Sequence, residues 1–400
     1  MESVSPAERL RTVHSATKTP AAVTGEMPFR LDPERLQRQQ AFLDRAPAER
    51  PLLGCVHGFN MTQVYPRVTA NLRQGQLMPE DIRTDLFLAD CDRLYELYRQ
   101  VDDDFPFVAA PFVYVPWMEA IMGCPIYASD SSIWAEPAME TWDSWRWERP
   151  TLDNPWARKL LELMTALVVH AAGRYPVAPT LMRGPSDILS ALRGGARFPF
   201  DFYDCPDTVR AALTLCTDTW IRIGKAQLAL VPPSDTGYLA GGHGLRTWAP
   251  DKVIWLQESA MALLSPRLLR EFILPETLRI ARAFPYTAFH LHGSALWSVD
   301  DLVLMPELDV LELNYDSARC DVEGTFAGWR KIRRRKPLVM WRQFDAEIWP
   351  WLDRVLAEFS PAGLAIQVTV ADVEEALALK ARISQAGMRM SLSGSPSALI

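Results

Sequence analysis

The feature that most constrains the fold of this chain is a regular alternation of short apolar runs with segments of helical period. Apolar, strand-like runs begin near residues 51, 106, 178, 253, 287, 309, 337 and 363. Amphipathic patterns typical of helices separate them, as at 79–99 and 265–284. Eight parallel strands joined through helices most economically form a single (β/α)8 barrel of the TIM type, and an open, doubly wound sheet is the alternative.

A single barrel accounts for most of the 400 residues. Residues 1–30 are polar and are predicted to form a partly ordered N-terminal arm, residues 31–387 the barrel, and residues 388–400 a C-terminal tail. The segment 227–250 is rich in glycine and proline, which predicts an insertion before the fourth strand.

Charge and cysteine content exclude several classes of protein. The net charge of -7 argues against a general electrostatic hold on nucleic acid or on an anionic membrane. The six cysteines are scattered without a CxxC pair, which favours a reducing, cytoplasmic setting. No apolar run approaches the roughly 20 residues that span a bilayer. The patterns GxGxxG, GxxxxGK[ST], GxSxG and HExxH are absent, so no bound nucleotide cofactor is expected.

Polar residues at the carboxyl ends of the runs form the predicted site, because reactive groups of parallel barrels gather there. Catalytic roles are expected for Glu258, His57, Arg183 and Arg342, and substrate contacts for Asn60, Trp117, Asn314 and Gln367. The two arginines suit a substrate carboxylate or phosphate, or an internal salt bridge. The acidic run 102–104 precedes the second strand and is expected to be a solvated loop.

The stretch FHLHG at 289–293 carries the sharpest signal. Residues two apart in a strand point the same way, so the imidazoles of His290 and His292 share one face. Together with Glu258 from the preceding strand, they have the composition of a site for zinc or another divalent transition metal. A metal-free acid/base or hydrogen-bonding pair, and simple core packing, are the alternatives.

Several segments resemble the uroporphyrinogen decarboxylase superfamily. They are PWMEAIMGCPI (116–126), MRGPSDILSALRG (182–194), LQESAMALLSPRLLREFILPETLRI (256–280) and FHLHGSALWSVDDLVLMPELDVLELNYD (289–316). Their order along the chain extends the resemblance over about residues 50–385. The resemblance implies a barrel of the kind deduced above.

Two branches of that superfamily differ at these positions. True uroporphyrinogen decarboxylases carry an arginine-rich RQAGR segment after the first strand, where this chain has CVHGFN, so the resemblance does not extend to that enzyme. The zinc-dependent methyltransferases, which move methyl groups between corrinoid proteins and thiols, carry an HxC pair on the fifth strand and a cysteine on the eighth. Here His290 matches, His292 replaces the cysteine, and no cysteine lies near Gln367. A nitrogen and oxygen site suits Lewis-acid chemistry better than thiolate activation.

The resemblance implies a metal-dependent, methyltransferase-like enzyme with a small-molecule substrate, a separate corrinoid protein as partner, and a homodimeric assembly. A metal-free decarboxylase or lyase is one alternative, in which Arg183 or Arg342 holds a substrate carboxylate and a histidine moves the proton. A barrel that only binds a corrinoid or tetrapyrrole is another.

Overall fold

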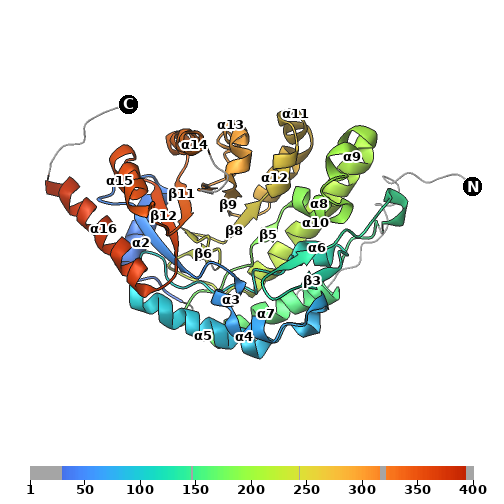
Figure 1. The fold of residues 1–400 in the computed structure, drawn as a ribbon, viewed down its shortest axis with the longest axis horizontal. Helices are drawn as coiled ribbons and strands as arrows, with labels where there is room; N and C mark the ends of the chain where they lie inside the picture. The colour runs from blue at the N-terminus through green and yellow to red at the C-terminus, as the bar shows by residue number, and fades with distance from the viewer. Residues whose placement is uncertain (1–28, 146, 243, 316–320, 393–400) are drawn as a thin grey trace, which may run out of the picture.

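A parallel sheet lies at the centre of the molecule (Figure 1). The computed structural model describes residues 29–145, 147–242, 244–315 and 321–392. The seven strands of the sheet, in spatial order, are β1 (Leu52–His57), β12 (Leu364–Val370), β11 (Leu338–Gln343), β10 (Val310–Asn314), β9 (Tyr286–Leu291), β8 (Val253–Gln257) and β5 (Met182–Arg183). From β12 to β5, neighbouring strands of the sheet follow one another in reverse chain order, and β1 lies beside β12, which is consistent with a TIM-type barrel. Among the described strands, the order does not change direction as it does in a doubly wound sheet.

The second predicted strand, near residue 106, is not a strand in the described part of the chain. Its sequence FPFVAAPFVYVP contains three prolines, which cannot donate backbone hydrogen bonds. The segment still runs between β1 and β5. The N–H of Asp104 donates to the carbonyl of Leu53 (3.1 Å), and Ala109 forms an isolated parallel bridge with Val177.

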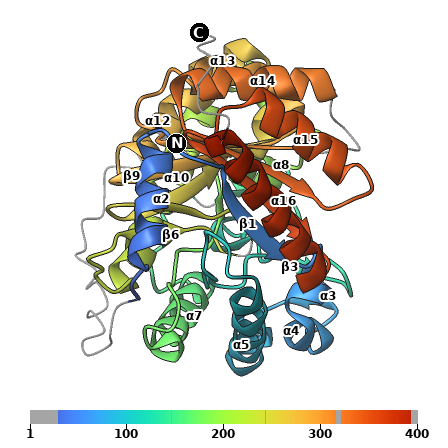
Figure 2. The same cartoon turned by 90° about the vertical axis from the view of Figure 1, so that its left-hand side faces the viewer.

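Helices cover the outer face of the sheet (Figures 1 and 2). The longer ones are α2 (Pro33–Leu43), α5 (Thr84–Val101), α7 (Pro155–Ala171), α8 (Pro185–Arg193), α10 (Pro206–Leu230), α12 (Leu274–Ala281), α14 (Val322–Arg335), α15 (Ile348–Glu358) and α16 (Val373–Leu392). Short helices include α3 (Met61–Val64), α4 (Pro66–Ala70), α6 (Trp117–Ile121), α9 (Phe198–Asp204), α11 (Pro266–Leu268) and α13 (Val299–Leu302). None of the helices in the described ranges has the length and apolarity needed to cross a membrane.

Outside the central sheet, the described residues also form two small antiparallel elements. One is a three-stranded sheet of β2 (Gly75–Leu77), β3 (Ile126–Ala128) and β4 (Ile133–Ala135). The other is a hairpin of β6 (Tyr238–Ala240) and β7 (Thr247–Ala249), which lies within the predicted insertion. Residues of this hairpin, such as Trp248, share a buried cluster with Val253 and Ala288 near the amino ends of β8 and β9. The hairpin therefore closes the amino-terminal end of the sheet.

Side-chain alternation along the strands separates an inner from an outer set. On β9, Ala288 belongs to the inner cluster, whereas Phe289 and Leu291 belong to the larger cluster packed against the helices. On β12, Ala365 faces inward and Ile366 outward in the same way. Residues two apart share a face, so the inward positions of every strand follow from these assignments.

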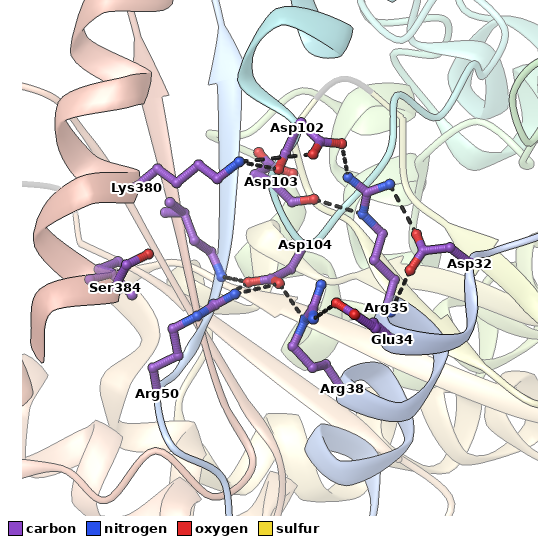
Figure 3. A pocket seen from close by; sticks show the side chains of 12 residues that line it. Asp32, Glu34, Arg35, Arg38, Arg50, Asp102, Asp103, Asp104, Lys380 and Ser384 are labelled. Carbon is purple, nitrogen blue, oxygen red and sulfur yellow. Dashed lines mark hydrogen bonds and ion pairs between the residues drawn. The ribbon is translucent and has the colours of Figure 1, made fainter. Parts of the chain in front are cut away.

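A charged cavity of about 340 Å³ lies at the amino-terminal end, between α2, α16 and the segment before residue 105 (Figure 3). The carboxylate of Asp104 accepts hydrogen bonds from both terminal nitrogens of Arg50 (2.5 and 2.9 Å) and from Nε of Arg38 (2.8 Å). It also accepts the N–H of Leu53 (2.8 Å). This network ties three elements together at the amino-terminal end of the sheet.

The prediction of a solvated acidic loop is wrong for two of its three residues. Asp103 and Asp104 are buried, and only Asp102 is exposed. The carboxylate of Asp103 accepts the backbone N–H groups of Cys55 (2.6 Å) and Phe105 (2.8 Å). Burial of these carboxylates is sustained because each one receives several donors.

Candidate active site

Four polar residues form a row across four neighbouring strands. In the parallel register Arg183 pairs with Gln257, Gln257 with His290, and His290 with Glu312. Adjacent strands lie about 4.8 Å apart, so the row spans about 14 Å between its outermost Cα atoms. The row continues on β11, β12 and β1 with the apolar residues Val339, Ala365 and Leu52. At this level of the sheet, the polar residues lie on the inner face of β5, β8, β9 and β10.

The imidazoles of His290 and His292 meet on this inner face. Their Nε2 atoms are 3.1 Å apart, and the two rings are nearly perpendicular, at 82°. Nδ1 of His290 is hydrogen-bonded to Oε2 of Glu312. His290 and Glu312 are both buried. A chain of carboxyl, imidazole and imidazole therefore leads from the interior of the sheet to His292.

Burial sets the charge state of this chain. It lowers the pKa of His290 to about 4 and raises the pKa of the Glu312 carboxyl well above its usual range. Both shifts favour the neutral form of the group. In the neutral forms, the Glu312 hydroxyl donates to Nδ1 of His290, and Nε2–H of His290 donates to Nε2 of His292. A metal ion bound to both Nε2 atoms would replace the proton between them and leave Nδ1–H of His290 donating to a Glu312 carboxylate.

Two cavities adjoin the histidine pair. The first, which we call the polar cavity, measures about 700 Å³ and includes Arg183, Asp187, Gln257, Ser259 and His292 in its lining. The second, the aromatic cavity, measures about 260 Å³ and is lined by Tyr114, Leu181, Leu245, Trp255, His290 and Trp341, among others. Both are lined by residues from the carboxyl-terminal halves of the strands and the loops that follow them.

The same strands serve both cavities. Leu181, Trp255 and His290 line the aromatic cavity, whereas the residues two positions further along line the polar one, namely Arg183, Gln257 and His292. Residues two apart on a strand are about 6.7 Å apart. The two cavities are therefore neighbours, with His290 on the wall of the aromatic cavity and His292 on the wall of the polar cavity.

Arg183 and Asp187 give the polar cavity its charge. A terminal nitrogen of Arg183 lies 3.1 Å from Oε1 of Glu119, and about half of the arginine side chain is exposed to the cavity. The Asp187 carboxylate accepts the N–H groups of Ser259 (3.1 Å) and Ala260 (2.6 Å). Burial raises the pKa of Asp187 to about 6. Sequence reasoning missed Asp187, although it lies four residues after Arg183 in the quoted MRGPSD segment.

Glu258, the expected third metal ligand or base, lies away from the histidine pair. It follows the inward-facing Gln257, and its Oε2 accepts the N–H (2.9 Å) and the hydroxyl of Ser186 in the first turn of α8. Gly184 permits this contact, because a Cβ there would lie 2.5 Å from the Glu258 carboxyl carbon. Burial, reinforced by the charge of Asp187, raises the pKa of Glu258 well above its usual range. The carboxyl beside the histidines is instead Glu312.

His57 and Arg342, expected to be catalytic, occupy outward positions of β1 and β11. The His57 ring packs edge-on against Tyr98, with 5.0 Å between centroids. The Arg342 guanidinium lies 4.9 Å from the ring centre of Trp351 on α15 and is bonded to Asp345. Both side chains face the helices rather than the two cavities.

Three of the four residues expected to contact substrate instead make hydrogen bonds to the protein backbone. The Asn60 side chain accepts the N–H three residues on and caps α3. Trp117 is buried and its indole donates to a backbone carbonyl (3.0 Å). The Gln367 amide bonds both backbone groups of Arg246, at 3.1 and 2.5 Å. Asn314 is half-buried at the end of β10, two residues beyond Glu312.

The fit of a metal ion depends on the histidine pair. Within the described ranges, no group of three histidine, cysteine, aspartate or glutamate residues could hold a metal ion. Two imidazole nitrogens that bind one zinc ion at 2.0–2.1 Å with a tetrahedral angle lie about 3.3 Å apart, close to the 3.1 Å found here. A carboxylate on the other nitrogen, as at His290, is the usual partner of a metal-binding histidine. The pair thus offers two ligands, which leaves the other positions to water or substrate.

Comparison with known proteins bears mainly on the fold. No family model matches the sequence, and no curated protein matches it. Among solved structures, a methyltransferase from Methanosarcina mazei superposes with a TM-score of 0.59 at 17% sequence identity. The match covers 88% of this chain and 98% of that chain. The chain therefore has the mixed α/β fold of that methyltransferase, with its sheet of parallel strands.

Proposed function

We propose that this protein is a cytoplasmic, methyltransferase-like enzyme of the uroporphyrinogen decarboxylase superfamily. Its reaction takes place at the carboxyl ends of the strands of a (β/α)8 barrel, in which the proline-rich segment after Asp104 completes the ring. The observation that carries the proposal is the 3.1 Å contact between His290 and His292, backed by Glu312 and flanked by the two cavities. The fold shared with a methyltransferase supports transferase chemistry.

The proposal includes one divalent transition metal ion, with zinc as the first candidate, on Nε2 of both histidines. Glu312 would hold Nδ1 of His290 and so fix the orientation of that ring. When bound, such an ion supplies a Lewis acid for a substrate atom. Since the pair contains no thiolate, the site is harder than that of the zinc methyltransferases that the sequence resembles.

The proposed methyl source is a separate corrinoid protein. In the transfer, the methyl group leaves cobalt(III) without its bonding electrons, which remain on cobalt(I), and forms a bond to the acceptor. The acceptor loses one proton. That proton passes to solvent, because a neutral imidazole whose Nε2 atom holds the metal ion has no lone pair left to accept it.

Methyl transfer from methylcobalamin tests the proposal. The purified enzyme, supplied with zinc, is mixed with methylcobalamin and a panel of thiols and carboxylated acceptors. Loss of the methyl–cobalt absorbance and the mass of the product are then followed. We expect product from the wild type and at least an approximately 100-fold lower rate from the double variant H290A/H292A. His170→Ala is the matched control, because His170 lies on α7 and is paired with Asp92. No methylated product from the wild type, or an undiminished rate in the double variant, contradicts the proposal.

A metal-free decarboxylase or lyase is the second candidate, favoured by the lack of a three-residue metal cluster within the described ranges and by Arg183 on the cavity wall. In that reaction Arg183 holds the substrate carboxylate, and His292 delivers a proton to the carbon that loses carbon dioxide. Release of carbon dioxide from a carboxylated substrate, unchanged after exhaustive chelation, would favour this function over methyl transfer.

A further inference from the structure

The two cavities on either side of the histidine pair differ sharply in chemistry. The polar cavity carries the guanidinium of Arg183, whereas the aromatic cavity is lined chiefly by large apolar side chains and glycines. Arg183 and His290 are separated by one intervening strand, β8, so their Cα atoms are about 10 Å apart. The distance between the two cavities is therefore within the length of one small molecule, and the histidine pair lies between them.

The aromatic cavity has the size and lining of a ring-binding site. Its volume is about 260 Å³, and a dry apolar cavity of about 150 Å³ is large enough for one benzene molecule. Trp255, Trp341 and Tyr114 contribute to its walls. The indole N–H of Trp341 already donates to Thr369 (2.9 Å), so this residue offers its ring surface to a ligand rather than a hydrogen bond.

The backbone of the β6–β7 loop keeps this cavity open. Gly241 has a φ of +90°, and a Cβ there would lie 1.3 Å from the carbonyl oxygen of Leu245. A Cβ at Gly242 would lie 2.8 Å from the Cβ of Ala110. Both positions require glycine, so these residues contribute backbone and no side chain to the cavity wall. The space is therefore a built feature of the hairpin.

The polar cavity selects a single negative charge. Arg183 supplies the guanidinium group of this cavity, and two carboxyl groups lie close to it. Oε1 of Glu119 is 3.1 Å from Arg183, and Asp187 lines the same cavity. A phosphate dianion would meet repulsion from these carboxyls, whereas one carboxylate matches the free edge of one guanidinium.

We propose that the substrate is a ring-bearing carboxylic acid, with its carboxylate on Arg183 in the polar cavity and its ring in the aromatic cavity. The linking atoms then pass His292 and His290, which places the reacting position at the histidine pair. The location of the reacting atom rests on the proposed function, but the binding mode does not.

Binding of three fluorinated probes, measured by 19F NMR titration without metal or methyl donor, tests the inference. The probes are 4-fluorophenylacetate, which has ring and charge, 2-(4-fluorophenyl)ethanol, which has the ring alone, and difluoroacetate, which has the charge alone. We expect 4-fluorophenylacetate to bind at least about 30-fold more tightly than difluoroacetate, because the ring leaves water. It should also bind about 10-fold more tightly than the alcohol, because of the charge-assisted hydrogen bonds.

Variants assign each half of the probe to its cavity. Arg183→Gln should weaken 4-fluorophenylacetate about 10-fold or more and leave the alcohol unchanged. Arg183→Lys retains a cation beside Glu119 and should give a smaller loss. Val113→Phe and Leu181→Phe fill the aromatic cavity from two sides. Each should weaken both ring probes about 10-fold and leave difluoroacetate unchanged. Val169→Phe, at an exposed position of α7, is the matched control and should change nothing.

Several results would overturn the inference. They are equal affinity for difluoroacetate and 4-fluorophenylacetate, no loss with Arg183→Gln, and no loss with either cavity-filling variant. Circular dichroism of each variant confirms that it is folded. A protein that binds 4-fluorophenylacetate as expected but transfers no methyl group contradicts the proposed function alone. A protein that methylates only acceptors without a ring and binds no ring acid contradicts this inference alone.

Discussion

The free energy of unfolding of the wild type should fall more steeply in acid than that of the variant His57→Gln. The His57 ring is buried against Tyr98, and neither ring nitrogen has a hydrogen-bond partner in the part of the chain that the structure describes. Burial first, and then the positive charges of Arg246 and Arg93, lower its pKa from 6.5 to about 4. The folded protein therefore keeps His57 neutral over a range in which the unfolded chain is protonated.

The sign and size of the effect follow from proton linkage. Between pH 6.5 and 4 the unfolded state binds more protons at this residue, so the free energy of unfolding falls as the pH falls. One proton gives a maximum slope of about 1.4 kcal/mol per pH unit. Integration from pH 7 to pH 5 gives a loss of about 2 kcal/mol that belongs to His57 alone. The contribution is complete above pH 6.5 and is lost as the pH approaches 4.

Urea unfolding followed by tryptophan fluorescence at pH 7, 6 and 5 measures this effect. The wild type should lose about 2 kcal/mol more than His57→Gln between pH 7 and 5. Asp103 and Asp187, whose pKa values burial raises to about 6, also titrate in this range, but both proteins contain them. Any constant cost of the substitution cancels in the pH dependence. Parallel curves for the two proteins would refute the reasoning.

Three further substitutions test contacts that stabilise the fold. Asp104→Asn breaks the buried pair with Arg50 and should lower the free energy of unfolding by about 3–5 kcal/mol. Burial alone would raise the pKa of Asp104, but the Arg50 hydrogen bonds outweigh it and lower this pKa below 3.8, so the wild type loses this contribution only as the pH falls below that value. Gly184→Ala places a Cβ 2.3 Å from the carbonyl oxygen of Gln257 and should cost about 1–3 kcal/mol in urea unfolding. Gln367→Leu leaves two buried backbone groups of Arg246 unpaired and should cost about 2–4 kcal/mol, with faster amide exchange in the β6–β7 hairpin. Unchanged unfolding midpoints in these variants would contradict the contacts described.

Much of the fold follows from the sequence, since apolar runs of strand length between amphipathic segments leave few arrangements. Apolarity alone could not show that the segment near residue 106 does not form a regular strand. Its prolines remove backbone donors from this segment, which keeps the bond from Asp104 to Leu53 of β1 and an isolated bridge between Ala109 and Val177. Likewise, the run of three aspartates at 102–104 predicts a solvent-exposed loop when only the sequence is known. Asp104 is buried only because Arg50 and Arg38, distant in the sequence, meet it there.

The candidate site was predictable only in part, for a geometric reason. The spacing of His290 and His292 places both on one face, because it lies within a single strand. The facing of residues on other strands depends on where each strand ends, and a shift of one residue reverses it. Glu258 lies one residue beyond the inward Gln257 and therefore points to α8, whereas Glu312, in register with His290, completes the chain. His57 and Arg342 face outward for the same reason.

The central claim, that His290 and His292 form a metal-binding reactive pair, is tested most directly by metal analysis of the purified protein. Inductively coupled plasma mass spectrometry is applied to the wild type and to H290A/H292A, both after reconstitution with zinc and removal of excess metal. The account predicts about one equivalent of zinc in the wild type and none in the double variant. No metal in either protein, or equal metal in both, would contradict it.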